Sequence, residues 1–177
     1  MAKPGGLAAR APLLIVLASL LVAPPLVMKL LDVAYPVPDV VPVSLSAVSA
    51  RVQAARGHPS VLYVYASWCE ACQTALPTLN RAVKRFEDQG VTFTIVSIDK
   101  DLDALQELLD ETGAAFEPFC VPAAREGAIS DLLTGLGAKP SGAIPYGVVF
   151  DSEGKVYREW TGWHSMDAWD GALSELL

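Results

Sequence analysis

Two cysteines, Cys69 and Cys72, are the residues of this sequence whose types and spacing best suit joint chemistry. They lie in the stretch YASWCEACQTALP, directly after Trp68. A pair with two residues between its members can be a redox couple, half of a metal site or a structural disulfide. The remaining cysteine, Cys120, lies far along the chain, so one pair and one single thiol is the natural division.

The local pattern favours the redox couple. Residues 60–67 form a β-branched and aromatic run typical of a buried strand, and residues 69–90 have the pattern of a helix. Cys69 therefore falls at a helix N-terminus, where free backbone N–H groups and the helix dipole favour a thiolate. Cys72 follows one turn later and can close a disulfide with Cys69. Attack by an exposed thiolate and release by a neighbouring thiol are the two steps of thiol–disulfide exchange.

The two other roles are less consistent with the sequence. A structural metal site needs four ligands, whereas the chain holds one cysteine pair and two histidines, His58 and His164, that are far apart. A disulfide across two residues constrains the unfolded chain little, because loop-closure entropy grows with loop length. We therefore predict a redox-active disulfide between Cys69 and Cys72, with no metal and no other cofactor.

Composition narrows the class of protein. The 177 residues are enough for one domain with its own core, so no disulfide framework is needed. The formal net charge is −7, and the 13 Lys and Arg residues are scattered, which argues against a nucleic-acid partner. The mean hydropathy of +0.35 is high for a soluble domain, and much of the apolar excess lies near the N-terminus.

The N-terminal segment has the pattern of a membrane anchor. Residues 11–28 carry no charge, and Lys3 and Arg10 precede them. A helix of that length would be about 27 Å long, close to the roughly 30 Å hydrocarbon core of a bilayer. We expect residues 1–30 to form a single transmembrane helix, with the rest of the chain outside the cytoplasm. A cleaved signal peptide and a cytosolic chain are the alternatives.

A proline-rich segment follows the expected anchor. Pro36, Pro38 and Pro42 fall within residues 31–43, and proline at this density favours an extended spacer. We interpret this segment as a tether, and residues 44–177 as the folded domain.

The predicted domain is of the α/β class. Parallel crossovers come first and an antiparallel hairpin, turning at residues 152–154, comes last, which indicates a sheet covered by helices on both faces. Helices are expected over residues 44–57, 69–90, 101–113, 125–137 and 165–177, and strands over residues 60–67, 91–99, 146–151 and 155–162.

The region around the cysteine pair resembles the active site of thioredoxins. The run from Trp68 to Cys72, with Pro77 beyond it, is similar to the thioredoxin active-site helix. Ile144-Pro145 before a strand, with Gly154 and Gly162 after it, is similar to the cis-proline loop and hairpin of that family. The resemblance implies a thioredoxin-like fold with a central mixed sheet flanked by helices. It also implies a nucleophile and a resolving thiol, Cys69 and Cys72, and client contacts by Trp68, Glu70, Ile144, Pro145 and Tyr146.

More narrowly, the chain is similar to the membrane-anchored TlpA/ResA/CcmG-type thioredoxins of bacteria. The N-terminal anchor, the early helix and an extra segment over residues 101–142 fit that group. The resemblance implies an exported thiol–disulfide oxidoreductase, held by one helix in the inner membrane with its catalytic domain in the periplasm. It would reduce disulfides of client proteins, as in the maturation of cytochrome c or of respiratory oxidases. Its electrons would come from a membrane donor of the DsbD or CcdA type.

Two departures from the thioredoxin pattern leave the redox direction open. Ala71 stands where the family often has proline, and Tyr63 stands where thioredoxin has a buried carboxylate. A disulfide oxidase or isomerase on the same fold therefore remains an alternative. A copper-handling chaperone that uses the cysteine pair, with His164 or Cys120, is another. No P-x-x-x-T-x-x-C arrangement is present, so a peroxidase is the least favoured enzyme class.

Two further features receive structural interpretations. Cys120 lies between Phe119 and Val121, and we expect a buried thiol that packs as a small apolar side chain. The acidic stretch over residues 99–111 is expected to be the solvated face of a helix.

Overall fold

The core of the protein is one six-stranded sheet in the order β1-β4-β3-β2-β5-β6. The computed structural model describes residues 37–122, 124–125 and 127–177. Strands β1 to β4 run parallel to one another, and β5 and β6 form the antiparallel hairpin. The strands are β1 (Val41–Pro42), β2 (Ser60–Tyr65), β3 (Thr92–Ser97), β4 (Phe119–Cys120), β5 (Tyr146–Phe150) and β6 (Val156–Thr161).

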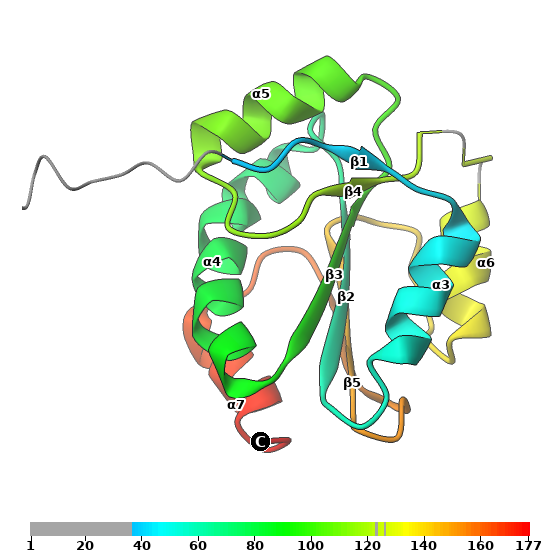
Figure 1. The fold of residues 1–177 in the computed structure, drawn as a ribbon, viewed down its shortest axis with the longest axis vertical. Helices are drawn as coiled ribbons and strands as arrows, with labels where there is room; N and C mark the ends of the chain where they lie inside the picture. The colour runs from blue at the N-terminus through cyan, green and yellow to red at the C-terminus, as the bar shows by residue number, and fades with distance from the viewer. Residues whose placement is uncertain (1–36, 123, 126) are drawn as a thin grey trace, which may run out of the picture. The chain divides into compact units, whose positions relative to one another are not determined.

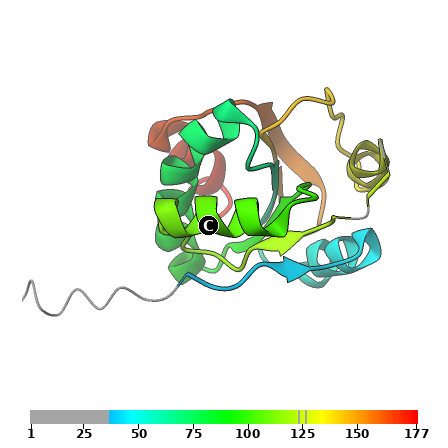
Figure 2. The same ribbon diagram turned by 90° about the horizontal axis from the view of Figure 1, so that it is seen from above.

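Helices cover both faces of this sheet (Figures 1 and 2). Helices α4, α5 and α7 pack on one face and α3 and α6 on the other. The mixed sheet flanked by helices that the sequence predicts is therefore confirmed. The helices are α3 (Leu45–Ala54), α4 (Glu70–Phe86), α5 (Leu102–Thr112), α6 (Ala128–Gly135) and α7 (Met166–Leu173), with a short 3-10 turn η1 (Glu87–Gln89) after α4.

Strand β2 shows why an unbroken apolar run forms the centre of the sheet. Its six residues are all buried. Val61 and Tyr63 enter the core beneath α4, α5 and α7, whereas Leu62 and Val64 enter the core beneath α3 and α6. A strand between two helical layers buries both faces, so hydrophobic residues need not alternate with polar ones. The strand ends in the loop that carries the cysteine pair.

The folded domain begins before the residue that the proline pattern indicates. Val41 and Pro42 form β1, which pairs in parallel with β4. The N–H of Val41 donates to the carbonyl of Pro118 (2.8 Å), and the N–H of Val43 donates to the carbonyl of Cys120 (2.7 Å). The proline pattern predicts a tether over residues 31–43, and the structure pairs Val41 and Pro42 of that segment with β4. Pro42 is compatible with this position because an edge strand leaves one side of its backbone unpaired.

The expected membrane anchor, residues 1–30, lies outside the described residues. Within the described part of the chain, no helix has the length and apolar character needed to cross a bilayer.

Glycine is needed at one position of the hairpin for close packing. A Cβ on Gly147 would lie 2.6 Å from Nε1 of Trp160 and 3.2 Å from the ring of Tyr63. Without a side chain there, the Trp160 ring packs edge-on against Trp169 of α7, with ring centroids 4.7 Å apart. This packing fixes β5, and with it the loop that precedes β5, against the rest of the core.

Candidate active site: a cysteine pair at the start of α4

Cys69 and Cys72 are joined in a disulfide, with their Cα atoms 5.1 Å apart. The two sulfurs differ in accessibility. Cys69 is half-buried, whereas the side chain of Cys72 is only 1% exposed and forms part of the core. A client protein can therefore reach Cys69 but not Cys72, which matches the division into an attacking and a resolving thiol.

The backbone of α4 directs a hydrogen-bond donor at the sulfur of Cys69. Cys69 is the N-cap of the helix, and the N–H of Cys72 donates to its Sγ at 3.2 Å. When the disulfide is reduced, the same N–H can donate to a thiolate, and the positive end of the helix dipole favours that charge. Glu70 occupies the first turn, where its exposed carboxylate faces solvent.

The loop before β5 lies against this sulfur. The peptide bond between Ile144 and Pro145 is cis, as the resemblance implies. The carbonyl oxygen of Ile144 lies 3.6 Å from Sγ of Cys69. The loop is held from behind because the N–H of Gly162, at the end of β6, donates to the carbonyl of Pro145 at 2.8 Å. Gly162 has φ of +87°, a conformation that favours glycine.

The predicted client contacts differ in how accessible they are. Trp68 is 66% exposed, Glu70 is also exposed and Ile144 is half-buried. Pro145 and Tyr146 are buried, and the hydroxyl of Tyr146 donates to the carboxylate of Glu159. The structure thus brings Ile144 against Cys69 and leaves Trp68 free to contact a client, and it turns Tyr146 inward.

Trp163 is an exposed aromatic residue next to the support of the cis-proline loop, and the sequence reasoning missed it. Its side chain is 52% exposed, and its indole N–H donates to the hydroxyl of Thr78 in α4 at 3.3 Å. It follows Gly162, which is bonded to the cis-proline. A tryptophan in a loop cannot be assigned as exposed from its type alone, so the sequence held no signal for this position.

Asp99 is a second feature that the sequence reasoning missed. It follows β3 and is 1% exposed, so the expectation of a solvated acidic stretch over residues 99–111 is wrong for its first residue. Its carboxylate accepts hydrogen bonds from the N–H of Ser67 (2.8 Å), the hydroxyl of Ser67 (2.6 Å) and the hydroxyl of Ser97. These donors replace water around the buried charge. Asp99 therefore fixes the loop two residues before Cys69.

Cys120 contacts the backbone of Asp99, whereas Ser67 contacts its carboxylate. Cys120 is fully buried, and its thiol donates to the backbone carbonyl of Asp99 at 3.2 Å. Burial raises the pKa of this thiol above its ordinary value, while a hydrogen bond with Ser97 acts in the opposite direction. The expected burial of Cys120 is confirmed, and the thiol is kept in its less reactive protonated form.

Tyr63 supplies no acid–base group in the neutral range. It is 2% exposed, and burial raises the pKa of its phenol far above the usual value. The proton relay that a carboxylate would give at this position is therefore absent. As for a metal, the described residues contain no group of three or more His, Cys, Asp or Glu side chains that could hold one.

Comparisons with known proteins agree with this site. The chain is 19% identical over 139 residues to the thiol-disulfide oxidoreductase ResA of Bacillus thuringiensis, and the match covers 78% of this chain and 75% of that one. Among solved structures, a thioredoxin-family thiol:disulfide interchange protein of Chlorobium tepidum superposes with a TM-score of 0.57 at 21% identity, over 70% of this chain and 83% of the other.

A disulfide oxidoreductase secreted by Mycobacterium tuberculosis, which is homologous to DsbE of E. coli, superposes with a TM-score of 0.55 at 21% identity, over 70% of this chain and 86% of the other. These likenesses show the thioredoxin-like fold. The sequence model of the AhpC/TSA family matches residues 33–159. The chain therefore belongs to the AhpC/TSA family and, with its Cys69–Cys72 disulfide, is a disulfide oxidoreductase of the thioredoxin-like kind.

Proposed function

We propose that the protein is an extracytoplasmic reductant that transfers two electrons from the Cys69–Cys72 dithiol to disulfides of client proteins. The observation that carries this proposal is the difference between the two sulfurs. Cys69 is accessible and bonded by a helix N–H, and Cys72 is buried directly behind it. Such a pair can hold a client as a mixed disulfide and then release it.

In the reduced protein, the thiolate of Cys69 attacks one sulfur of a client disulfide. The client S–S bond breaks, a bond forms between Cys69 and the client, and the leaving sulfur takes up a proton. Cys72 then loses its proton and attacks Sγ of Cys69, which restores the Cys69–Cys72 disulfide and frees the client as a dithiol. The carbonyl of Ile144, 3.6 Å from Sγ of Cys69, lies beside the sulfur at which both steps occur.

The site of action and the electron donor belong to the same proposal. The apolar stretch over residues 11–28, with Lys3 and Arg10 before it, supports a single inner-membrane helix with the domain on the periplasmic side. The TlpA/ResA/CcmG-like sequence pattern supports a reductive role in the maturation of cytochrome c or respiratory oxidases, and the thiol-disulfide oxidoreductase named for one relative is consistent with exchange chemistry. A membrane donor of the DsbD or CcdA type would return two electrons to the disulfide after each turnover.

The reduction potential of the pair tests the direction of electron flow. The full chain, with Cys120→Ala to leave one dithiol, is equilibrated in thiol buffers of known potential, and the reduced fraction is counted by alkylation and mass spectrometry. We expect a value at or below about −230 mV, at which the pair can reduce most non-structural disulfides. A value above about −150 mV would contradict the proposal and favour a disulfide oxidase or isomerase.

A further inference from the structure

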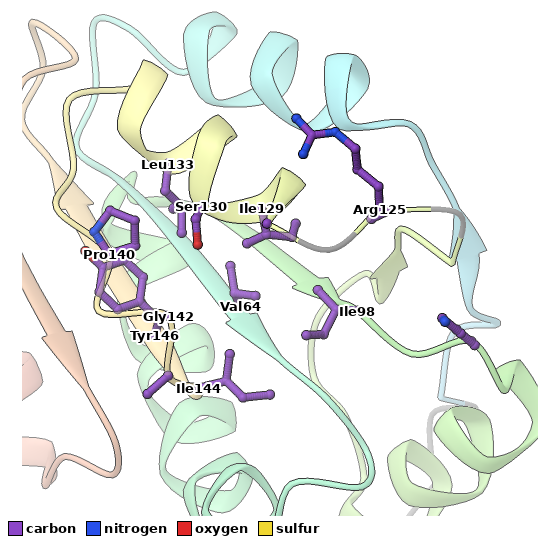
Figure 3. Close-up of a pocket in the computed structure, with 14 residues that line it drawn as sticks. Val64, Ile98, Arg125, Ile129, Ser130, Leu133, Pro140, Gly142, Ile144 and Tyr146 are labelled. Atoms are coloured by element: carbon purple, nitrogen blue, oxygen red, sulfur yellow. The ribbon is translucent and has the colours of Figure 1, made fainter.

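A cavity of about 420 Å³ opens beside the cis-proline loop. Figure 3 shows Val64 of β2, Ile98 after β3 and Leu133 of α6 turned toward one space, with Ile144 below them. Ile129 of α6 completes its aliphatic wall. We call this space the α6 pocket. Its walls come from elements far apart in the chain.

Ile144 belongs both to the wall of the α6 pocket and to the surroundings of the reactive sulfur. Ile144 lines the pocket, and its carbonyl oxygen lies 3.6 Å from Sγ of Cys69. A client cysteine bonded to Cys69 must therefore lie against Ile144. Because an extended chain advances about 3.3–3.6 Å per residue, side chains one or two residues from the client cysteine reach the mouth of the pocket.

The size and chemistry of the α6 pocket define its occupant. An engineered apolar cavity of about 150 Å³ already holds a benzene ring, so this space accepts a large aromatic or aliphatic side chain. Lys100 and Arg125 are the two exposed cations among the lining residues, and no salt bridge in the described part of the chain involves Lys100. Arg125 also lines the pocket but pairs with Asp131 and points toward α3 (Figure 3).

We propose that the α6 pocket selects clients by holding a large apolar side chain one or two residues from the client cysteine, while Lys100 receives a carboxylate beside it. This inference rests on the proposed function, because it concerns the client bound at Cys69. The apolar contact gives most of the selectivity, since burying a large apolar side chain stabilises binding more than an exposed ion pair does. The exposed ammonium adds a smaller, salt-dependent contribution.

Model peptides test the inference on the full-length reduced protein. Each peptide carries one cysteine in a disulfide with 2-mercaptoethanol, followed by Phe or Ala and then by Glu or Gln. Release of the free peptide thiol is followed by acid quench and chromatography. We expect the second-order rate constant for reduction of the Phe peptide to exceed that for the Ala peptide by about tenfold or more, and Glu to exceed Gln by about two- to threefold at low salt.

Variants then locate the preference. Ile129→Trp and Ser130→Phe fill the α6 pocket from two adjacent positions, and each is expected to remove most of the Phe preference. Thr134→Trp is the matched control, because Thr134 is exposed on the same helix and does not line the pocket. Lys100→Ala is expected to remove the Glu preference, whereas Lys84→Ala, an exposed lysine on α4, leaves it intact.

A small neutral disulfide separates this inference from the proposed function. Every variant is also assayed with 2-hydroxyethyl disulfide, which has no group for the α6 pocket, and rates within twofold of the unsubstituted protein show that the reactive site is intact. Equal rates for the Phe and Ala peptides, or a Phe preference that survives both filling variants, would overturn the inference alone. No reduction of either peptides or 2-hydroxyethyl disulfide would overturn the proposed function, and the inference with it.

Discussion

Cys69 and Cys120 both lie at the carboxyl ends of parallel strands of the sheet, but their environments are opposite. Cys69 follows β2 and Cys120 ends β4, and both strands run parallel to the β3 that lies between them. Cys69 has left the sheet, caps a helix and is half-buried. Cys120 is still within the sheet and fully buried. A shift of a few residues past the strand end therefore separates a reactive sulfur from an inert one.

Asp99 belongs to both environments. Its carboxylate holds the N–H and hydroxyl of Ser67, just before the reactive loop, and its backbone carbonyl accepts from the thiol of Cys120. Asp99 therefore connects the loop before the reactive cysteine to the buried thiol. Four experiments test this contrast.

The largest effect is expected from the reactive sulfur itself. Cys69→Ser removes the nucleophile, and we expect client-disulfide reduction to fall by at least about a thousandfold. Cys120→Ala is the matched control and should stay within twofold of the unsubstituted protein, because its thiol is inaccessible. A comparable loss in Cys120→Ala, with the fold intact by circular dichroism, would show that the third thiol takes part in exchange.

Alkylation rates measure the same contrast without an assay for function. In the reduced native protein, iodoacetamide should modify Cys69 at least about a thousandfold faster than Cys120, since the buried thiol reacts only when the structure opens. Peptide mapping by mass spectrometry gives both rates in one sample. If Cys120 were modified as fast as Cys69, the core around Asp99 would open far more often than its hydrogen bonds imply.

Substitution of Asp99, which is hydrogen-bonded to both Ser67 and Cys120, is expected to lower the stability of the fold. Asp99→Ala leaves the N–H and hydroxyl of Ser67 and the hydroxyl of Ser97 without their acceptor, at a cost of about 2–5 kcal/mol in the free energy of unfolding. Urea denaturation measures it. Asp103→Ala, at an exposed position in the next helix, is the control and should cost less than about 0.5 kcal/mol. Equal costs would remove Asp99 from its supporting role.

The smallest effect is the pH dependence of the buried thiol. Burial raises the folded-state pKa of Cys120 above the ordinary 9.0, so folding favours the protonated form. The resulting stabilisation is fully present below pH 9.0 and is lost as the pH rises through the folded-state pKa. The difference in unfolding free energy between the unsubstituted protein and Cys120→Ala, measured under reducing conditions, should therefore fall above pH 9 and stay constant from about pH 6 to 8. A difference that rose above pH 9 would mean that the folded state prefers the thiolate.

The sequence was informative where residue type and periodicity act locally. Runs such as residues 60–67 and 91–99 predict strands because both faces are apolar, and the C-x-x-C pair after a strand predicts a helix start. The cis bond before Pro145 came from the resemblance to thioredoxins, because no local pattern distinguishes it. The helix expected over residues 165–177 begins at its first residue, where the hydroxyl of Ser165 caps α7 by accepting the N–H of Ala168.

The rest depended on contacts between distant residues. Strands β1 and β4 have two residues each, too few to show any period, and Pro42 argued against a strand. Asp99 looked solvated because an acid is buried only where donors converge on it, and here they come from Ser67, in the loop after β2, and from Ser97, at the end of β3. The α6 pocket unites Val64, Ile98, Ile129 and Ile144, which a sequence shows merely as separate apolar residues.

The proline in β1 also bears on how the protein behaves at high concentration. The N–H groups of Val41 and Val43 point inward to β4, so the outward-facing position of this edge belongs to Pro42, which has no N–H to offer. A strand from a second molecule would find no backbone donor at the middle of this edge. The same short segment that closes the sheet therefore also protects this edge from pairing with other copies, and so from edge-to-edge aggregation.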